Sequence, residues 1–241
     1  MEYIEAKPSD KTNNLLLFCL FNLHKIKLPI NYLEIIIKMV KYSKIYIFEK
    51  DINIIKQDAF YGCKNLISII IPNLVYSIKE DAFCDCIKLT NVIIPNSVIN
   101  IEAQAFYNCK SLTSIIIPNS VYNIGNSAFT YCSSLTSIVI PNSVTSIKCN
   151  AFNCCTSLTS VVISNSVTSI EKHTFCNCKN LISVTIPNKS TDLPDLRSNS
   201  ITTIKNYSFH GCEKLISIVI PDSVISIGNK AFSEHTKIIR K

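Results

Sequence analysis

The sequence has no tryptophan, only four glycines and only two arginines among its 241 residues. So few glycines argue against the glycine-rich loops that hold phosphate groups and against the nucleophile elbow of hydrolases. The net charge of +7 comes mainly from dispersed lysines, whereas nucleic-acid recognition relies on arginine and on clustered positive charge. We therefore expect neither an enzyme nor a nucleic-acid-binding protein.

Long apolar runs are also missing. The run near the start, Leu15 to Phe21, is far shorter than the ~20 residues that span a bilayer. It follows acidic residues and has no small-residue cleavage site, unlike a secretory signal peptide. We therefore expect no membrane span and a cytoplasmic location, with the cell surface, reached by a non-standard route, as the alternative.

What the sequence has in abundance is repetition. Phenylalanine recurs every 23 residues, with a single longer gap of 34 residues that contains eleven extra residues. Leucine and proline columns keep the same step. A period of this length is typical of solenoids, in which each repeat forms one coil. The phenylalanine column consists of Phe60, Phe83, Phe106, Phe129, Phe152, Phe175, Phe209 and Phe232.

One repeat predicts the structure of a coil. Leu112, Ile115 and Ile117 have the spacing of a short strand with alternate residues facing inward. Pro118 ends that strand because it has no N–H for the ladder. A second inward-facing stretch and an apolar helical turn follow. The inward residues of these two segments are Val121, Ile124, Ala128, Phe129 and Cys132.

A single repeat is too small to fold alone. About six large apolar side chains at ~2 kcal/mol each do not offset ~1.5 kcal/mol of ordering entropy for each residue of the repeat. Stacking lets neighbouring coils share both faces, so we predict a repeat solenoid of about eight coils over residues 45–241.

The phrase LTSIxIPNSVxxIGxxAFxxC resembles the repeat of BspA-like proteins, the treponemal-type, 23-residue class of leucine-rich repeats. The resemblance covers about residues 45–235, with departures such as Ser164 in the proline column. It implies a curved, right-handed leucine-rich-repeat superhelix with parallel strands and short helical or 3-10 turns. It also implies a non-enzymatic scaffold that binds proteins, and in microbes such proteins are often surface adhesins.

The outward strand positions form a candidate partner-binding surface. They alternate with inward residues and continue at Thr185 and Val219. An exposed apolar row of this length suggests a docking surface, although the same residues are also expected from β-propensity alone. The row, called here the apolar strip, consists of Ile70, Ile93, Ile116, Val139 and Val162.

Two further features are candidates for recognition. Tyr76 and Tyr122 lie two coils apart on a variable column, and tyrosines on a rigid support suit partner binding. The eleven-residue insertion, residues 189–199, carries Asp192, Asp195 and Arg197. Surface loops often carry recognition, although an insertion of this length is also easily tolerated.

Most of the twelve cysteines form another column. Seven recur at one fixed position of the repeat, where a single file of side chains is poorly aimed for disulfides. We interpret them as buried structural thiols. Cys84 and Cys176 add C-x-C pairs, and His210 takes the same offset, but the spacing that closes a zinc site is missing. We expect no metal and no cofactor.

Residues 1–44 do not follow the period. Within them, residues 26–41 have Leu33, Ile36, Ile37 and Val40 at helical spacing after a Leu-Pro pair. This segment is predicted to be a helical cap on the first coil. It also weakly resembles the start of an F-box, which would imply a substrate receptor that binds a ubiquitin-ligase adaptor.

Overall fold

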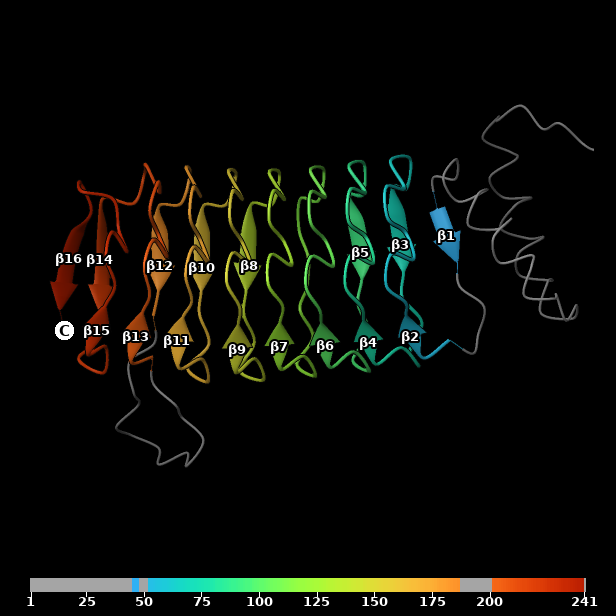
Figure 1. The fold of residues 1–241 in the computed structure, drawn as a ribbon, viewed down its shortest axis with the longest axis horizontal. Coiled ribbons are helices and arrows are strands. Elements are labelled where there is room, and N and C mark those ends of the chain that lie inside the picture. Colours follow the sequence, from blue (N-terminus) through green and yellow to red (C-terminus); the bar gives the residue numbers. More distant parts are fainter. Residues whose placement is uncertain (1–44, 48–51, 187–200, 241) are drawn as a thin grey trace, which may run out of the picture.

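The computed structural model describes residues 45–47, 52–186 and 201–240. In these residues the chain winds into about eight coils that stack in one row (Figure 1). The predicted solenoid is therefore confirmed, and each coil corresponds to one sequence repeat. The proposed N-terminal helical cap lies outside the described residues.

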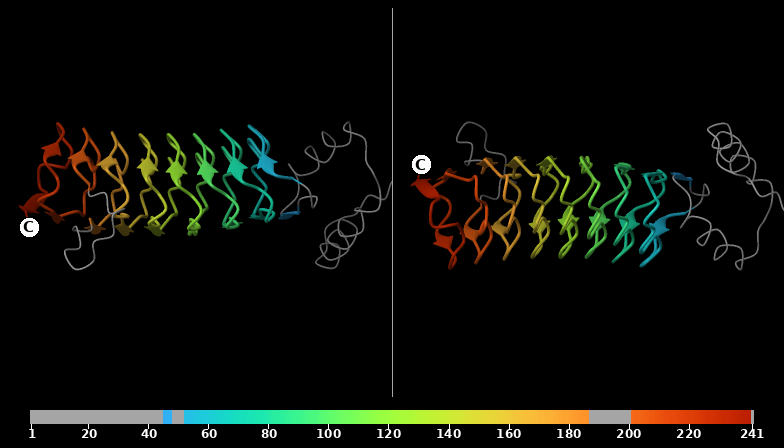
Figure 2. Two further views of the ribbon diagram at one scale, coloured as in Figure 1. Left: turned by 90° about the horizontal axis from the view of Figure 1, so that it is seen from below. Right: turned by 90° about the horizontal axis from the view of Figure 1, so that it is seen from above.

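The coils contribute short strands to two rows that lie on opposite sides of the stack (Figures 1 and 2). The first strand row consists of β1 (Ile45–Ile47), β3 (Ser68–Ile70), β5 (Asn91–Ile93), β8 (Ser137–Val139), β10 (Ser160–Val162), β12 (Ser183–Thr185), β14 (Ser217–Ile220) and β16 (Lys237–Arg240). The second strand row consists of β2 (Ile54–Ile55), β4 (Ser77–Ile78), β6 (Asn100–Ile101), β7 (Asn123–Ile124), β9 (Ser146–Ile147), β11 (Ser169–Ile170), β13 (Thr203–Ile204) and β15 (Ser226–Ile227).

All strand pairs are parallel, and their register follows the sequence period. Ser160 pairs with Ser137 on one side and with Ser183 on the other, a step of 23 residues in each direction. Across the insertion the step grows to 34, because Ser169 pairs with Thr203. The register therefore continues unchanged across the eleven extra residues.

The phenylalanine column forms the centre of the core. Rings in successive coils are stacked with centroids 5.0 to 5.4 Å apart and interplanar angles of 2 to 10°. The rings from Phe83 to Phe209 are fully buried. Offset stacking of aromatic rings adds to the stabilisation that burial of their surface provides.

The predicted helical turn around Phe129 is wrong. No residue in the described ranges is helical, and this segment is instead a series of β-turns. Ser127 and Tyr131 have positive φ angles of 55° and 62°, which a right-handed helix does not allow. Successive backbone N–H groups donate alternately within the coil and to the next coil. Thr130 N–H donates to Ser127 O in the same coil (3.1 Å), and Phe129 N–H donates to Ala151 O of the next coil (2.8 Å).

This turn segment also explains the shape of the stack. The resemblance implied a curved solenoid, but the described coils form a nearly straight row (Figures 1 and 2). A helix on one side would push neighbouring coils apart there. Here the phenylalanine rings of successive coils have centroids 5.0 to 5.4 Å apart, which is close to the ~4.8 Å between neighbouring parallel strands. The coils are therefore similarly spaced on the turn side and on the strand side.

We expect Phe129→Ala to lower the free energy of unfolding by about 3–5 kcal/mol, because the truncated side chain leaves a cavity between two neighbouring rings. Urea denaturation followed by circular dichroism measures the change. Ile116→Ala is the control, since that side chain is 82% exposed and its loss should change stability by less than about 0.5 kcal/mol. Equal midpoints for the two variants would contradict a core built on the phenylalanine stack.

Candidate partner-binding surface

The apolar strip lies on the outer face of the first strand row. Its five side chains are 45 to 82% exposed, and Ile116 is the most exposed of them. The neighbouring residues Ile115 and Ile117 are buried, as the alternation of a strand requires. The predicted exposure of the strip is therefore present in the structure, while its role in binding stays a prediction.

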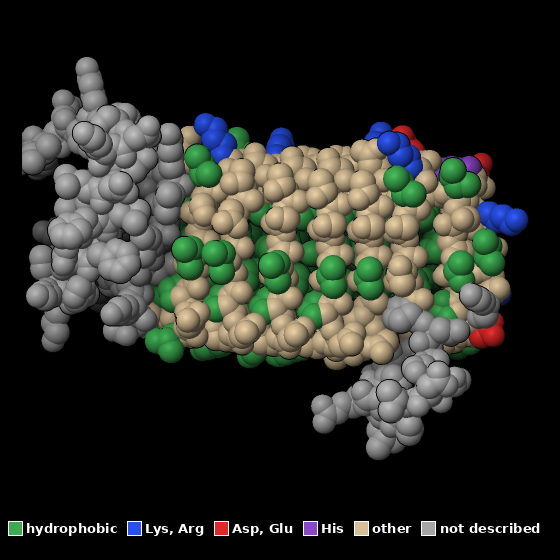
Figure 3. Space-filling model, turned by 180° about the vertical axis from the view of Figure 1, so that it is seen from behind, with side chains coloured by type: hydrophobic (Ala, Val, Ile, Leu, Met, Phe, Trp, Pro, Cys, Tyr) green, Lys and Arg blue, Asp and Glu red, His purple; other side chains and the backbone are tan. Residues whose placement is uncertain are grey.

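The strip forms part of a longer apolar surface. Val219 continues the row after Thr185, and hydrophobic side chains are visible in a line along the stack in Figure 3. Beside the strip, Thr136 and Thr159 donate their hydroxyl groups to carbonyls of the preceding coil, at 3.2 and 3.0 Å. These hydroxyls are engaged within the ladder, so the face is more apolar than its composition indicates.

A shallow depression of about 590 Å³ lies at the middle of this face. It extends over three coils, between the side chains of Ile116, Val139 and Val162 and the turns that follow the strands. Residues 113–117, at one end of the depression, belong to no assigned strand. The depression gives a partner a concave place in an otherwise regular surface.

Ser164 lies at the edge of the depression, where the repeat otherwise has proline. Its hydroxyl is buried and accepts a hydrogen bond from the backbone N–H of Ser166 at 3.0 Å. This local bond closes the turn in place of the proline ring, as serine hydroxyls often do. The substitution therefore preserves the shape of the coil.

The middle of the chain carries no formal charge. No lysine, arginine, aspartate or glutamate occurs between Lys110 and Lys148. Ile116 and Val139, at the centre of the apolar strip, belong to this uncharged segment. A partner that covers them therefore does not have to bury an unpaired charge of this chain, which would be costly.

Tyr76 and Tyr122 lie on a different side of the coil. Both are exposed, and they precede strands β4 and β7 of the second strand row. The Tyr122 hydroxyl accepts a hydrogen bond from Asn100 Nδ2 at 3.1 Å. The structure therefore does not bring these tyrosines together with the apolar strip, and they would serve a second contact surface.

Other tyrosines cluster on the β-turn segments. Tyr107 and Tyr131 form an edge-to-face pair with ring centroids 5.5 Å apart. The repeat spacing does not predict this contact, because Tyr131 stands one residue further along its repeat than Tyr107. Tyr131 has a positive φ of 62°.

Two predicted recognition segments are not covered by the described ranges. Asp192, Asp195 and Arg197 lie outside the described residues, as do residues 26–41. The described residues that flank the insertion, Ile186 and Ile201, are both buried. The chain is therefore buried in the core at the last described residue before the insertion and at the first one after it.

Comparison with known proteins identifies the repeat. Residues 53–182 and 196–240 match the protein family described as BspA type leucine rich repeat region, in six copies. The chain belongs to this family. The resemblance noted in the repeat phrase is thus confirmed, and a search of curated proteins gave no match.

Solved structures of other BspA-type and leucine-rich-repeat proteins are similar to this chain. The T. pallidum leucine-rich repeat protein TpLRR is 29% identical with a TM-score of 0.62, over 71% of this chain and 78% of that one. A leucine-rich repeat protein from Bacteroides ovatus is 23% identical with a TM-score of 0.49, over 81% and 72%. A leucine-rich cell surface protein from Faecalibacterium prausnitzii is 30% identical with a TM-score of 0.41, over 76% and 62%.

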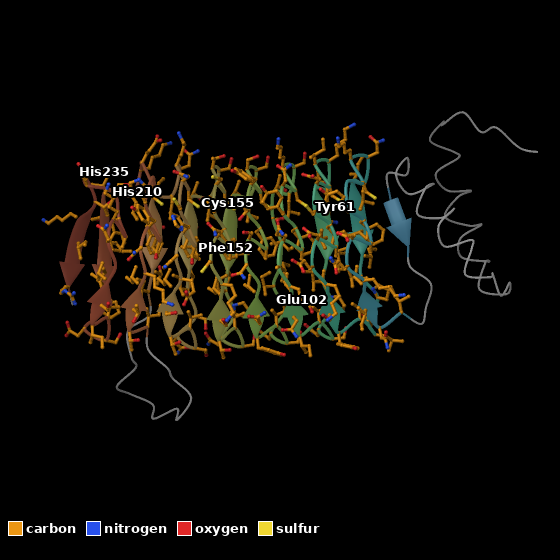
Figure 4. The ribbon with its side chains drawn as sticks, in the orientation of Figure 1. Tyr61, Glu102, Phe152, Cys155, His210 and His235 are labelled. Carbon is orange, nitrogen blue, oxygen red and sulfur yellow. The ribbon has the colours of Figure 1, made fainter. Side chains whose placement is uncertain are left out.

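The column cysteines of this BspA-type repeat connect neighbouring coils through hydrogen bonds from their thiols to backbone carbonyls. The thiol of Cys132 donates to the carbonyl of Phe106 in the preceding coil, and Cys155 donates to Phe129, both at 3.2 Å. Phe152 and Cys155 lie inside the stack, as Figure 4 shows. No disulfide is present among the described cysteines, which agrees with a structural column.

Burial suppresses the reactivity of this column. It raises the pKa of Cys132 to about 12 and that of Cys212 to about 12, because a thiolate is poorly solvated inside the core. The described residues contain no group of three or more metal-ligating side chains, and no helix among them could cross a membrane. Cys84 and Cys176 are buried thiols as well.

The raised pKa predicts a loss of stability at alkaline pH. Above about pH 9 the unfolded chain releases the Cys132 proton while the folded chain retains it, so unfolding becomes more favourable as the pH rises. Cys132→Ser keeps a hydroxyl donor but removes the ionisation. Between pH 8 and about pH 10.5, its free energy of unfolding should fall by about 2 kcal/mol less than that of the wild type.

Urea denaturation at the two pH values measures this difference. Cys149→Ser is the control, because Cys149 is half-buried and stands outside the column. An identical pH dependence for wild type and Cys132→Ser would show that the column thiol does not resist ionisation in the folded state.

Proposed function

We propose that this protein is a non-enzymatic scaffold that binds another protein through the apolar strip. The observation that carries the proposal is the row of exposed isoleucine and valine side chains, whose central members, Ile116 and Val139, belong to the segment without charged residues between Lys110 and Lys148. Exposed apolar rows of this kind are unusual for a surface that meets only water.

Rigidity supports the same function. Four of the five strip residues lie in strands that pair in register, and the side chains of the strip are β-branched with few rotamers. A partner therefore meets a preorganised surface and little conformational entropy is lost on binding. Side chains at the centre of an interface usually contribute most of the affinity, which here favours Ile116 and Val139 beside the central depression.

Additional contacts belong to the same proposal. Tyr76 and Tyr122 offer a second surface beside the second strand row. Asp192, Asp195 and Arg197 of the insertion, which follows β12 in the sequence, offer charged recognition groups. Binding through more than one surface would raise the selectivity for a single partner. Adhesion at a cell surface and adaptor binding by residues 26–41 are alternative uses of the same scaffold.

We expect the variant Ile116→Asp with Val139→Asp to lose its bound partner, because two carboxylates would have to be buried without a counter-charge. Affinity capture followed by quantitative mass spectrometry should show recovery at least about tenfold lower, which corresponds to 1.4 kcal/mol.

Ile225→Asp is a matched control, since Ile225 is also 82% exposed but lies beside β15 in the second strand row. A thermal unfolding curve similar to that of the wild type establishes that the variants are folded. If the strip variant and the control capture the same proteins in the same amounts, the strip is not the binding surface.

The N-terminal segment has its own test. We expect Leu28→Ala with Pro29→Ala to lower the thermal midpoint of the protein without affecting any adaptor contact, because a cap on the first coil shields its apolar end. Differential scanning calorimetry measures the midpoint, and pull-down with a purified ubiquitin-ligase adaptor measures binding. Capture of the adaptor by the wild type and its loss in the variant would instead identify an F-box-like receptor.

A further inference from the structure

Three exposed side chains form a ladder beside the second strand row. Tyr76, Ile99 and Tyr122 occupy the same position in successive repeats. Ile99 N–H donates to Tyr76 O at 2.9 Å, and Tyr122 N–H donates to Ile99 O at 3.1 Å, so the three residues are neighbours in successive coils. Their exposed fractions are 43, 37 and 46%. We call these three residues the tyrosine row.

The spacing of the two tyrosines follows from the coil spacing. Parallel strands lie ~4.8 Å apart, so two coil steps separate Tyr76 from Tyr122 by ~9.6 Å. A polyproline II helix has three residues per turn and rises ~3.1 Å per residue, so its residues i and i+3 lie on one edge ~9.3 Å apart. An extended strand instead repeats its side chains on one face every ~6.8 Å. An α-helix is ~10–12 Å across with its side chains, too wide to enter the space between the two tyrosines.

The segments that surround the tyrosine row carry no formal charge. They are residues 72–78, 95–101 and 118–124. Lys79 and Glu102, which follow the first two segments, pair with each other at 2.6 Å between Nζ and Oε1. A ligand without charged side chains is therefore complementary to this surface, whereas a charged ligand would lose hydration there without gaining a counter-charge.

A hydrogen-bond donor lies in the same row. The Tyr122 hydroxyl oxygen accepts a hydrogen bond from Asn100 Nδ2 at 3.1 Å, which leaves its O–H to donate to a ligand. A polyproline II helix has no internal hydrogen bonds, so its carbonyl groups are acceptors that need partners. A neutral donor on the row thus suits a neutral acceptor on the ligand.

We propose that the tyrosine row binds a proline-rich segment of another polypeptide in the polyproline II conformation, with the segment lying along the stack. Prolines three residues apart would pack against the rings of Tyr76 and Tyr122, above Ile99, and the Tyr122 O–H would donate to a carbonyl of the segment. Aromatic surfaces bind such segments because the polyproline II helix is ordered before it binds. The inference names the ligand class of the second surface in the proposed function, and it rests on that function only in the use of this surface for binding.

The test uses the full chain and two fluorescein-labelled peptides of identical composition. The first, Ala-Ala-Pro-Ala-Ala-Pro-Ala-Ala-Pro-Ala, has prolines three residues apart. The second, Ala-Ala-Pro-Ala-Pro-Ala-Ala-Ala-Pro-Ala, has no two prolines at that spacing. We expect saturable binding of the first peptide by fluorescence anisotropy. The affinity for the second should be at least about fivefold lower, because only one of its prolines at a time meets a tyrosine.

Removal of either ring should weaken binding. We expect Tyr76→Ala and Tyr122→Ala each to lower the affinity for the first peptide at least about fivefold. Tyr122→Phe keeps the ring but removes the donor, so its effect should be smaller. Tyr61→Ala is the matched control, since Tyr61 is 51% exposed but lies on a β-turn segment, and this variant should bind as the wild type does.

An added ring should strengthen binding only at the correct spacing. Thr145 and Thr168 are exposed and continue the position of the tyrosine row in the next two repeats. Thr168→Tyr places a third ring two coil steps beyond Tyr122, where the third proline of the first peptide would lie, and should raise the affinity about fivefold. Thr145→Tyr places the same ring only one step beyond and should not raise it. Misfolding of a variant does not produce such a gain.

Three results would overturn the proposal. The first is no saturable binding of the first peptide at millimolar concentration, and the second is equal affinity for the two peptides. The third is an equal effect of Thr145→Tyr and Thr168→Tyr, since the ring spacing would then be irrelevant. Ile116→Asp with Val139→Asp should bind the first peptide as the wild type does, so a failure of the apolar strip as a binding surface is distinguishable from a failure of the tyrosine row.

Discussion

The stacking of one coil on the next, with every inward residue in register, is the constraint on which the rest of the structure depends. Ser160 pairs with Ser137 and Ser183 at a constant step of 23 residues, and the same step places Phe129 between two other rings and Cys132 beside a carbonyl of the preceding coil. No coil has enough apolar surface to fold alone, so stability arises at the interfaces between coils. A register shift at one coil would disrupt all of these columns together.

The same constraint creates the surface that binding would use. Because equivalent residues lie above one another, an outward isoleucine in one repeat becomes a continuous row when the repeat is copied. Ile93, Ile116 and Val139 are exposed as a consequence of the alternation that buries Ile115 and Ile117. Within this regular row, the uncharged segment between Lys110 and Lys148 and the shallow depression distinguish one part of the face from the rest.

Much of this arrangement could be predicted from the sequence, because a long period converts spacing directly into spatial columns. The coil boundaries, the buried phenylalanines and the exposure of Ile116 all follow from it. The helical turn could not be predicted from apolar spacing, since Ala128, Phe129 and Cys132 fit a helix equally well. The missing signal lay in the polar residues before or between the equivalent apolar residues of other coils: Asp81, Asp85, Asn108 and Asn150 have positive φ, a conformation that asparagine and aspartate tolerate better than most residues. The separation of Tyr122 from the apolar strip depends on a different turn, the one closed by the hydrogen bond from Val121 N–H to Pro118 O.

Interior and terminal coils of a solenoid differ in whether their strand edges and apolar faces have partners. An interior coil satisfies both edges of its strands with neighbours, whereas a terminal coil leaves one edge and one apolar face without them.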